Sequence, residues 1–199
     1  GKLNTGVNDP RIQWILEQFA AAGADESILY DAKPHIGTDA LLTVVQNLRR
    51  RILALGGEVR FSAQATGFLR EDGALSGLEV CERGETYTLP CRHAILAIGH
   101  SARDTFETLL QSGVPMEPKA FSMGVRIEHR QEMVNKSQYG AFADRLGAAD
   151  YKLNVRFPDG TSAYTFCMCP GGHVVAAASE EGGVVTNGMS DFARDGENA

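Results

Sequence analysis

The sequence predicts a mixed fold, in which an α/β first part is followed by an α+β second part with antiparallel strands. Two amphipathic helix patterns alternate with strand patterns in the first part. The apolar run 94–98 then leads through a glycine into a further helix pattern, as in the strand–turn–helix units of open sheets. Beyond about residue 114, alternating strand patterns are joined by short turns rich in Pro and Gly, which favours antiparallel sheets.

Helices and strands are predicted in a clear order in the first half. Asp9 and Pro10 begin a helix that ends near Gly23. A second helix starts at Thr38 and ends at Gly56 and Gly57. Three strands follow, and the turn pairs between them predict an antiparallel meander. The strands are expected at 58–69, 75–81 and 85–89, with turns at Asp72-Gly73 and Arg83-Gly84.

The stretch after the meander has the form of a ligand-binding junction. The run 94–98 has the length of a buried parallel strand, and Gly99 allows a sharp turn after it. Ser101 and Asp104 form a capping-box pattern for a helix that stops at Gly113. Unpaired backbone N–H groups at such a helix start favour a phosphate or another anion. A strand–turn–helix without any ligand fits the same residues equally well.

The second half is predicted to be mainly antiparallel. Alternation over 121–128 predicts a half-buried strand, and one or two short helices fit between Gln131 and Leu146. Gly113, Pro115 and Pro118 interrupt regular structure, which predicts a domain boundary close to residue 114. Three later strands, joined by short turns, are expected to be consecutive neighbours, and they are 151–157, 162–169 and 173–179.

Composition bounds the possible functions. Hydrophobic residues make up 43% of the 199 residues and charged residues 22%, which is typical of a globular protein. The net charge of −6 argues against a nucleic-acid surface. There is no apolar run long enough for a membrane span, so no membrane partner is expected. Four cysteines are too few for a disulfide scaffold, and we expect a reduced, cytoplasmic protein.

Six segments, taken in order, carry a resemblance to a known family. Together with the order of helix, Gly-Gly, meander and apolar strand, they resemble bacterial FAD-dependent dehydrogenases, often labelled NAD(FAD)-utilising dehydrogenases, which have a glutathione-reductase-like fold. The six segments are 1–5 (GKLNT), 33–39 (KPHIGTD), 99–104 (GHSARD), 124–129 (GVRIEH), 164–172 (YTFCMCPGG) and 185–190 (VTNGMS). The G-x-G-x-x-G loop that opens this fold has no counterpart in the sequence, and neither does its last flavin-contacting segment. The chain therefore resembles the central part of the enzyme.

The resemblance implies a domain plan and a chemistry. Residues 1–113 would be a partial FAD-binding domain without the pyrophosphate loop, and 114–199 a substrate or cap domain with an antiparallel sheet. It implies FAD as the cofactor of the longer parent, NAD(P)H as a candidate reductant, a small-molecule substrate, and the remainder of the parent chain as partner. The chain alone is expected to be inactive, and no catalytic residue is named. The alternative is a cofactor-free binding domain that recruits a partner through its antiparallel sheet.

The resemblance also implies site residues, and plainer alternatives stand beside them. The alternative is a frayed chain terminus for residues 2–5, a core strand for Ala63 and Gln64, and a helix cap or solvent contact for His100. For Arg126 the alternative is an ion pair with Glu128 on the same strand face. The cofactor side would comprise Lys2, Leu3, Asn4, Thr5, Ala63, Gln64, Gly99, His100 and Ser101, and the substrate pocket Arg126, Tyr164, Cys167 and Cys169.

The C-x-C pair suggests redox or metal chemistry, but its spacing argues against both. Cys167 and Cys169, two apart on a predicted strand, would point the same way with Cα atoms about 6.5 to 7 Å apart, at the outer limit for a disulfide. Zinc would need two more ligands. We therefore expect packed, reduced thiols and no metal.

Overall fold

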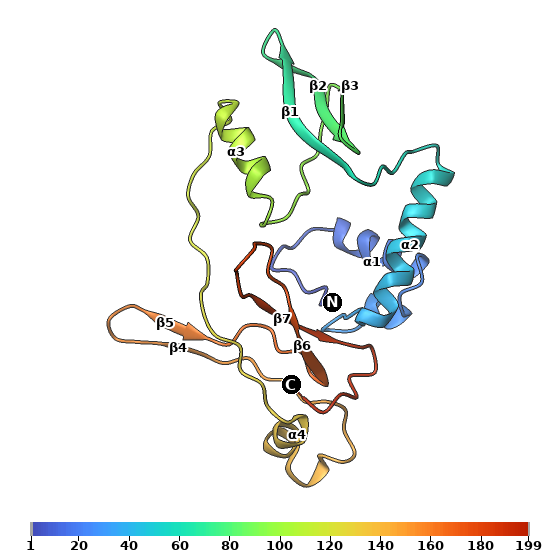
Figure 1. Ribbon diagram of the computed structural model, residues 1–199. Helices are drawn as coiled ribbons and strands as arrows, with labels where there is room; N and C mark the ends of the chain where they lie inside the picture. The colour runs from blue at the N-terminus through green and yellow to red at the C-terminus, as the bar shows by residue number, and fades with distance from the viewer. Residues whose placement is uncertain (1, 199) are drawn as a thin grey trace. The chain divides into compact units, whose positions relative to one another are not determined.

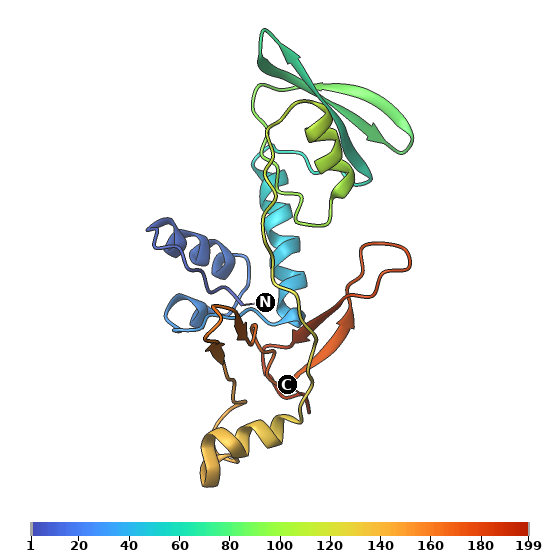
Figure 2. The same ribbon diagram turned by 90° about the vertical axis from the view of Figure 1, so that its left-hand side faces the viewer.

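The computed structural model describes residues 2–198, and Gly1, which opens the first motif, and Ala199 lie outside the described residues. The chain divides into two compact units (Figures 1 and 2). The first unit combines Gly1–Gly56 with Val125–Ala199, and the second is Gly57–Gly124. This division differs from the expected boundary close to residue 114. The assignment of a cofactor domain and a substrate domain stays a prediction.

The N-terminal helices of the first unit follow the predicted pattern. Helix α1 (Arg11–Ala21) begins after Pro10, and the Asp9 carboxylate accepts a hydrogen bond from the Arg11 amide at 2.9 Å. The 3-10 helix η1 (Glu26–Leu29) follows, and α2 (Thr38–Ala54) comes next. Both predicted helices are confirmed. Their apolar faces, with the loops between them, bury a core of Ala22, Ala24, Ile28, Ile36 and Val44.

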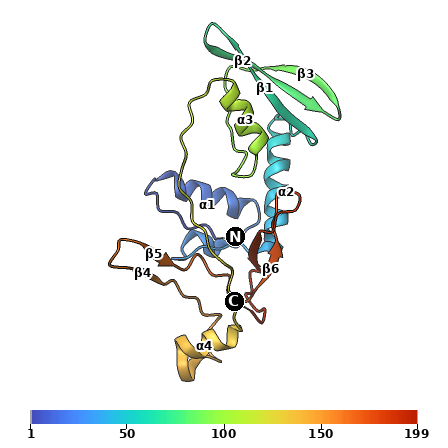
Figure 3. The same cartoon turned by 60° about the vertical axis from the view of Figure 1, so that its left-hand side comes forward.

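The C-terminal part of the first unit contains α4 (Gln131–Tyr139), the 3-10 helix η2 (Gly140–Phe142) and two separate strand pairs. The predicted short helices are confirmed. Strands β4 (Asn154–Arg156) and β5 (Ser162–Tyr164) pair antiparallel, as Figure 3 shows. Strand β6 (Gly172–Ala176) pairs with β7 (Thr186–Ser190).

The expectation that the strands at 162–169 and 173–179 are neighbours is wrong. β5 ends at Tyr164, the next residue still hydrogen-bonds to Leu153, and β6 pairs with β7 instead. Met168 is buried with Val134 and Ala149 in a second small core. The amides of Gly171 and Gly172, between the two predicted strands, donate to the Gln131 side chain and the Asn198 carbonyl, so they are not available for a hairpin ladder.

The second unit is the predicted meander followed by a helix. Strands β1 (Ala63–Glu71), β2 (Ala74–Glu82) and β3 (Glu85–Pro90) lie in that order and pair antiparallel. Both connecting turns place their central residues at positive φ, the geometry of tight hairpin turns. Helix α3 (Arg103–Gln111) contacts β1, as Figure 2 illustrates, and buries Thr105 and Leu109.

The buried parallel strand predicted at 94–98 is wrong. These residues form no strand, and Ile95 is 94% exposed. A parallel strand requires a hydrogen-bonding neighbour along its edge, and the described residues supply none beside this run. The apolar composition that predicted burial is real, but its burial depends on a pairing that composition does not specify.

The half-buried strand predicted at 121–128 is also wrong. The segment is irregular, and its alternating apolar residues are exposed, with Met123 at 86% and Val125 at 88%. Alternation predicts which side chains share a face, but only a paired neighbour turns that face into a buried one.

The mixed α/β class with small antiparallel sheets is observed. Among the described residues, no helix combines the length and apolar character needed to cross a bilayer.

Candidate functional site

Four of the six motifs meet in the first unit, near the start of α2. Lys2 forms an isolated antiparallel bridge with His35, and the Leu3 amide donates to the Pro34 carbonyl at 3.0 Å. The Lys2 ammonium donates to the Met168 carbonyl. The first motif is thus joined to the second through its backbone and to the fifth through a side chain.

The N-terminus of α2 contacts the last motif directly. The Thr38 hydroxyl donates to the Ser190 carbonyl at 3.3 Å, and the Asp39 carboxylate accepts from the Phe192 amide at 3.1 Å. That hydrogen bond lowers the pKa of Asp39 below its usual value. A Cβ on Gly37 would lie 2.1 Å from the Phe192 nitrogen, so only glycine permits this approach. We call Lys2, His35, Gly37–Asp39, Met168 and Ser190 the α2 junction.

His35 is the titratable group buried at the α2 junction. Its side chain is 8% exposed, and its Nε2 lies 3.4 Å from the Ser190 hydroxyl. Burial lowers the pKa of His35 to about 4, and the positive charges of Arg194 and Lys2 act in the same direction. The imidazole is therefore neutral at pH 7, with one nitrogen free to donate and the other to accept.

Two predicted pocket residues meet at Gly188, in the last motif. A Cβ on Gly188 would lie 2.7 Å from Nη1 of Arg126 and 2.9 Å from Sγ of Cys169. A guanidinium and a thiol thus pack against the same stretch of bare backbone. Of the two other predicted pocket residues, Tyr164 lies on β5 and Cys167 is exposed. The expectation of a packed thiol is therefore wrong for Cys167, because the predicted strand that would have packed it does not extend to this residue.

The alternative of an ion pair between Arg126 and Glu128 is not seen within residues 2–198. The Glu128 carboxylate accepts from the Asn198 amide at 3.0 Å instead. The segment that carries both residues is not a strand, so the shared face on which the pair was based does not form. All four cysteines are free thiols, and no three potential metal ligands cluster among the described residues.

Gln131 is a site residue that sequence reasoning missed. Its buried amide donates to the Ala149 carbonyl at 2.9 Å and to Asn135 at 2.8 Å. Its oxygen accepts from the Gly171 amide at 2.8 Å, which holds the Pro-Gly-Gly turn of the fifth motif. A glutamine at the first position of a helix gives no such signal. The signal available was the Pro-Gly-Gly turn itself, whose backbone amides require an acceptor once they are buried.

The remaining predicted cofactor residues lie in the second unit. Ala63 and Gln64 begin β1, and the Gln64 amide donates to the Asp104 carboxylate in the first turn of α3. This brings β1 to the segment that contains Gly99, His100 and Ser101. Asn4 and Thr5 lie in the first unit and are exposed.

The capping box predicted at the start of α3 is wrong. The N-cap residue is Ala102, and the Ser101 hydroxyl lies 2.9 Å from Nδ1 of His100 instead of capping the helix. The helix starts one residue later than the box requires, and the Asp104 carboxylate accepts from the Gln64 amide. Gly99 has a φ of +71°, as its predicted role in a sharp turn requires.

Two comparisons with known proteins bear on this site. Residues 120–199 match the family described as FAD-dependent protein, C-terminal domain-like. The whole chain is 48% identical over 202 residues to an uncharacterized protein of Clostridium beijerinckii (strain ATCC 51743 / NCIMB 8052). The chain spans 37% of the length of that relative. The matched residues contribute Arg126, Met168, Cys169, Gly188 and Ser190 to the site described above, and the match supports an FAD-dependent protein family.

Proposed function

We propose that the chain is part of a longer FAD-dependent oxidoreductase of the cytoplasm, in which hydride passes between a substrate, or NAD(P)H, and the flavin. The main support for this proposal is the position of the motifs in the structure. Motifs far apart in the sequence meet at the α2 junction, and the part of it that follows residue 120 belongs to the segment that matches an FAD-dependent family.

The residues of the second unit are suited to the cofactor. A Cβ at Gly99 would meet no atom within 4 Å, so the backbone before α3 is open to a ligand. The positive φ there turns the chain toward the amides at the helix start, and His100 and Ser101 add polar groups. In this proposal Gly99, His100 and Ser101 hold phosphate or ribose, with Ala63 and Gln64 beside the adenine. When bound, FAD supplies the hydride-accepting ring.

Two residues of the first unit, Arg126 and His35, are proposed to serve the substrate. Arg126 offers a permanent positive charge next to Gly188 for an anionic or carbonyl oxygen. His35 is neutral and hydrogen-bonded to Ser190, so it holds that strand end in place without adding charge. Lys2, which we propose on the cofactor side with Leu3, Asn4 and Thr5, ties the first motif to the chain just before the Pro-Gly-Gly turn.

Flavin analysis of the longer protein tests the proposal. We expect visible yellow colour on purification and close to one FAD per chain after denaturation and chromatography of the released flavin. A longer protein that is folded and holds no flavin, even after incubation with FAD, would refute it. That result would favour the cofactor-free binding domain.

A further inference from the structure

The paired strands β4 and β5 form a ribbon with two chemically different faces. Asn154 is opposite Tyr164, and Arg156 is opposite Ser162, so these four side chains share one face. One residue beyond the strands, the Thr165 amide donates to the Leu153 carbonyl and the Leu153 amide donates to the Thr165 hydroxyl, both at 2.8 Å. We call Lys152, Asn154, Arg156, Ser162 and Tyr164 the basic ribbon face.

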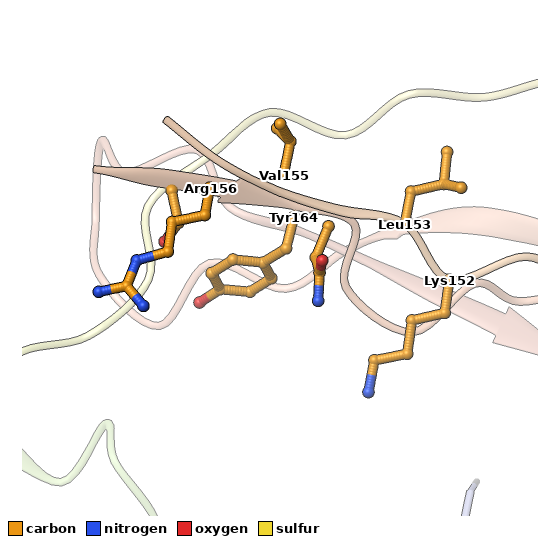
Figure 4. A pocket seen from close by; sticks show the side chains of 7 residues that line it. Lys152, Leu153, Val155, Arg156 and Tyr164 are labelled. Atoms are coloured by element: carbon orange, nitrogen blue, oxygen red, sulfur yellow. The ribbon is translucent and has the colours of Figure 1, made fainter. Parts of the chain in front are cut away.

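The close-up confirms the alternation. Lys152, Arg156 and Tyr164 extend to one side of the ribbon, and Leu153 and Val155 extend to the other (Figure 4). Residues of both faces of the ribbon, Leu153 and Val155 included, line a hollow of about 370 Å³. That volume lies in the range of about 300 to 1,000 Å³ that is typical of small-molecule sites.

The charge of this face is not neutralised by the protein. Among the residues that the structure describes, Lys152 and Arg156 form no ion pair. The carboxylates nearest in sequence are engaged elsewhere. Asp150 pairs with Lys33 at 3.0 Å, and Asp159 accepts from the Thr161 amide at 2.9 Å. In a chain of net charge −6, two unpaired cations without a carboxylate on one small face favour an anionic ligand.

The side chains of the basic ribbon face favour one class of anion, a phosphate attached to a planar ring. A guanidinium presents a planar fork that matches phosphate, and an ammonium adds a point charge. The Tyr164 side chain is 52% exposed and supplies an aromatic surface for a planar ring. Asn154 and Ser162 add neutral donors and acceptors for sugar hydroxyls. A long nucleic acid would need a basic track that this acidic chain does not offer.

We propose that the basic ribbon face binds a small ligand in which a phosphate group is linked to a planar ring, with an adenine nucleotide such as ADP as the probe. The phosphate lies against Lys152 and Arg156, and the ring stacks on Tyr164. This inference does not depend on flavin binding by the chain. The ADP moiety occurs in both NAD(P)H and FAD, and the two sources are separated in the experiment.

Calorimetric titration of the 199-residue chain with ADP, adenosine and inorganic phosphate tests the site. We expect ADP to bind more tightly than either part alone. The double variant Lys152→Gln/Arg156→Gln is expected to weaken ADP binding at least tenfold, and Tyr164→Leu to weaken adenosine and ADP but not phosphate. The matched control Arg92→Gln/Lys119→Gln removes the same charge from exposed positions of the second unit and leaves binding unchanged.

The fold and the source of the ligand are checked in the same series. Amide NMR spectra of the variants should keep the signals of β6 and β7, because all substituted side chains are exposed. Competition with NADH and with FAD identifies the natural source as the dinucleotide that displaces ADP at the lower concentration. The proposal is overturned by absence of ADP binding, by equal affinity in the native chain and the double variant, or by an equal loss in the control.

Discussion

At the scale of single residues, the α2 junction is built from groups that tolerate little change. His35 is buried as a neutral imidazole between positive charges, and Gly37 lets the backbone of α2 approach Phe192. Neither feature is visible in composition. Both follow from contacts between segments about 150 residues apart in the sequence, of which the hydrogen bond between His35 and Ser190 is one.

The titration of His35 predicts how stability depends on pH. Its folded pKa of about 4 is below the ordinary value of 6.5, so the unfolded chain takes up the proton first. The contribution of His35 to the free energy of unfolding should have its full value above pH 6.5. It should decrease as the pH falls toward 4, by at most about 3 kcal/mol. Urea unfolding at pH 7.5 and pH 5 measures it. His35→Gln should remove this part of the pH dependence, whereas the exposed His173→Gln should leave it intact.

Gly37 predicts a steric effect on stability. Gly37→Ala places a methyl group against the Phe192 backbone, which cannot move aside as a flexible side chain would. We expect a loss of about 1 to 3 kcal/mol in the free energy of unfolding, as for overpacked sites. Gly6→Ala is the matched control, because a Cβ at Gly6 meets no atom within 4 Å and its backbone is not left-handed. Equal stability of the two variants would show that the α2 junction adapts without cost.

At the scale of elements, the second unit shows which patterns produce structure unaided. The meander forms because each strand pairs with its sequence neighbour through a short turn. The apolar run 94–98 has no such neighbour and remains irregular. Gly99 lies between this run and α3. The proposed cofactor contact is therefore flanked by an irregular segment on one side and by a regular helix on the other.

The backbone at Gly99 predicts a selective loss of flavin from the longer protein. Gly99→Val adds a branched side chain where the proposed cofactor approaches, and it also strains a φ of +71°. Gly113→Val is the matched control, because its φ is +77° and its Cβ also meets open space. We expect FAD content to fall sharply in the first variant and to persist in the second, with similar thermal stability. Full FAD occupancy in the Gly99→Val variant would show that this segment is a structural turn that does not contact the cofactor.

The run 94–98 predicts a difference in hydrogen exchange between the chain and the longer protein. In the chain alone, its amides have no strand partner and should exchange as fast as those of an open loop. In the longer protein we expect slow exchange, because an apolar run of this kind is stabilised by pairing and burial. Mass spectrometry of the peptide that contains it measures both. The β2 peptide serves as the internal control, since it is paired on both edges in the chain itself. Fast exchange in both proteins would show that the run 94–98 forms no strand in either of them.

At the scale of the whole molecule, the proposed site residues are divided between two units. Lys2, Leu3 and Arg126 belong to the first, and Gln64 and Gly99 to the second. Each unit has its own small core or sheet, and large apolar side chains such as Phe121 and Val184 are exposed at 81% and 91%. Exposed apolar surface of this extent is typical of segments that bind another surface.

This division predicts that the chain alone does not retain flavin. The cofactor residues we propose are scattered, and the sequence contains no G-x-G-x-x-G loop to bind a pyrophosphate strongly. We expect a colourless protein after purification, and no stoichiometric FAD in the visible absorption spectrum. Yellow protein with one FAD per chain would show that the contacts at Gly99 and Gln64 suffice on their own.

Local sequence alone determined the parts whose interactions are local. The starts and ends of α1 and α2, the meander and its two hairpin turns, and the short helices after Gln131 were all predictable, because caps, glycines and periodicity act over a few residues. The motifs of the α2 junction were also visible in the sequence as segments, although not as neighbours.

Tertiary structure alone decided what depends on distant partners. Apolar runs at 94–98 and 121–128 predicted burial, yet a strand is buried only when another strand pairs with it. The meeting of Lys2 with Met168, the clamp of Gln131 on Gly171, and the neutral His35 arise from contacts between segments 40 or more residues apart. Such contacts depend on how whole elements pack, and no local pattern encodes which surfaces will meet.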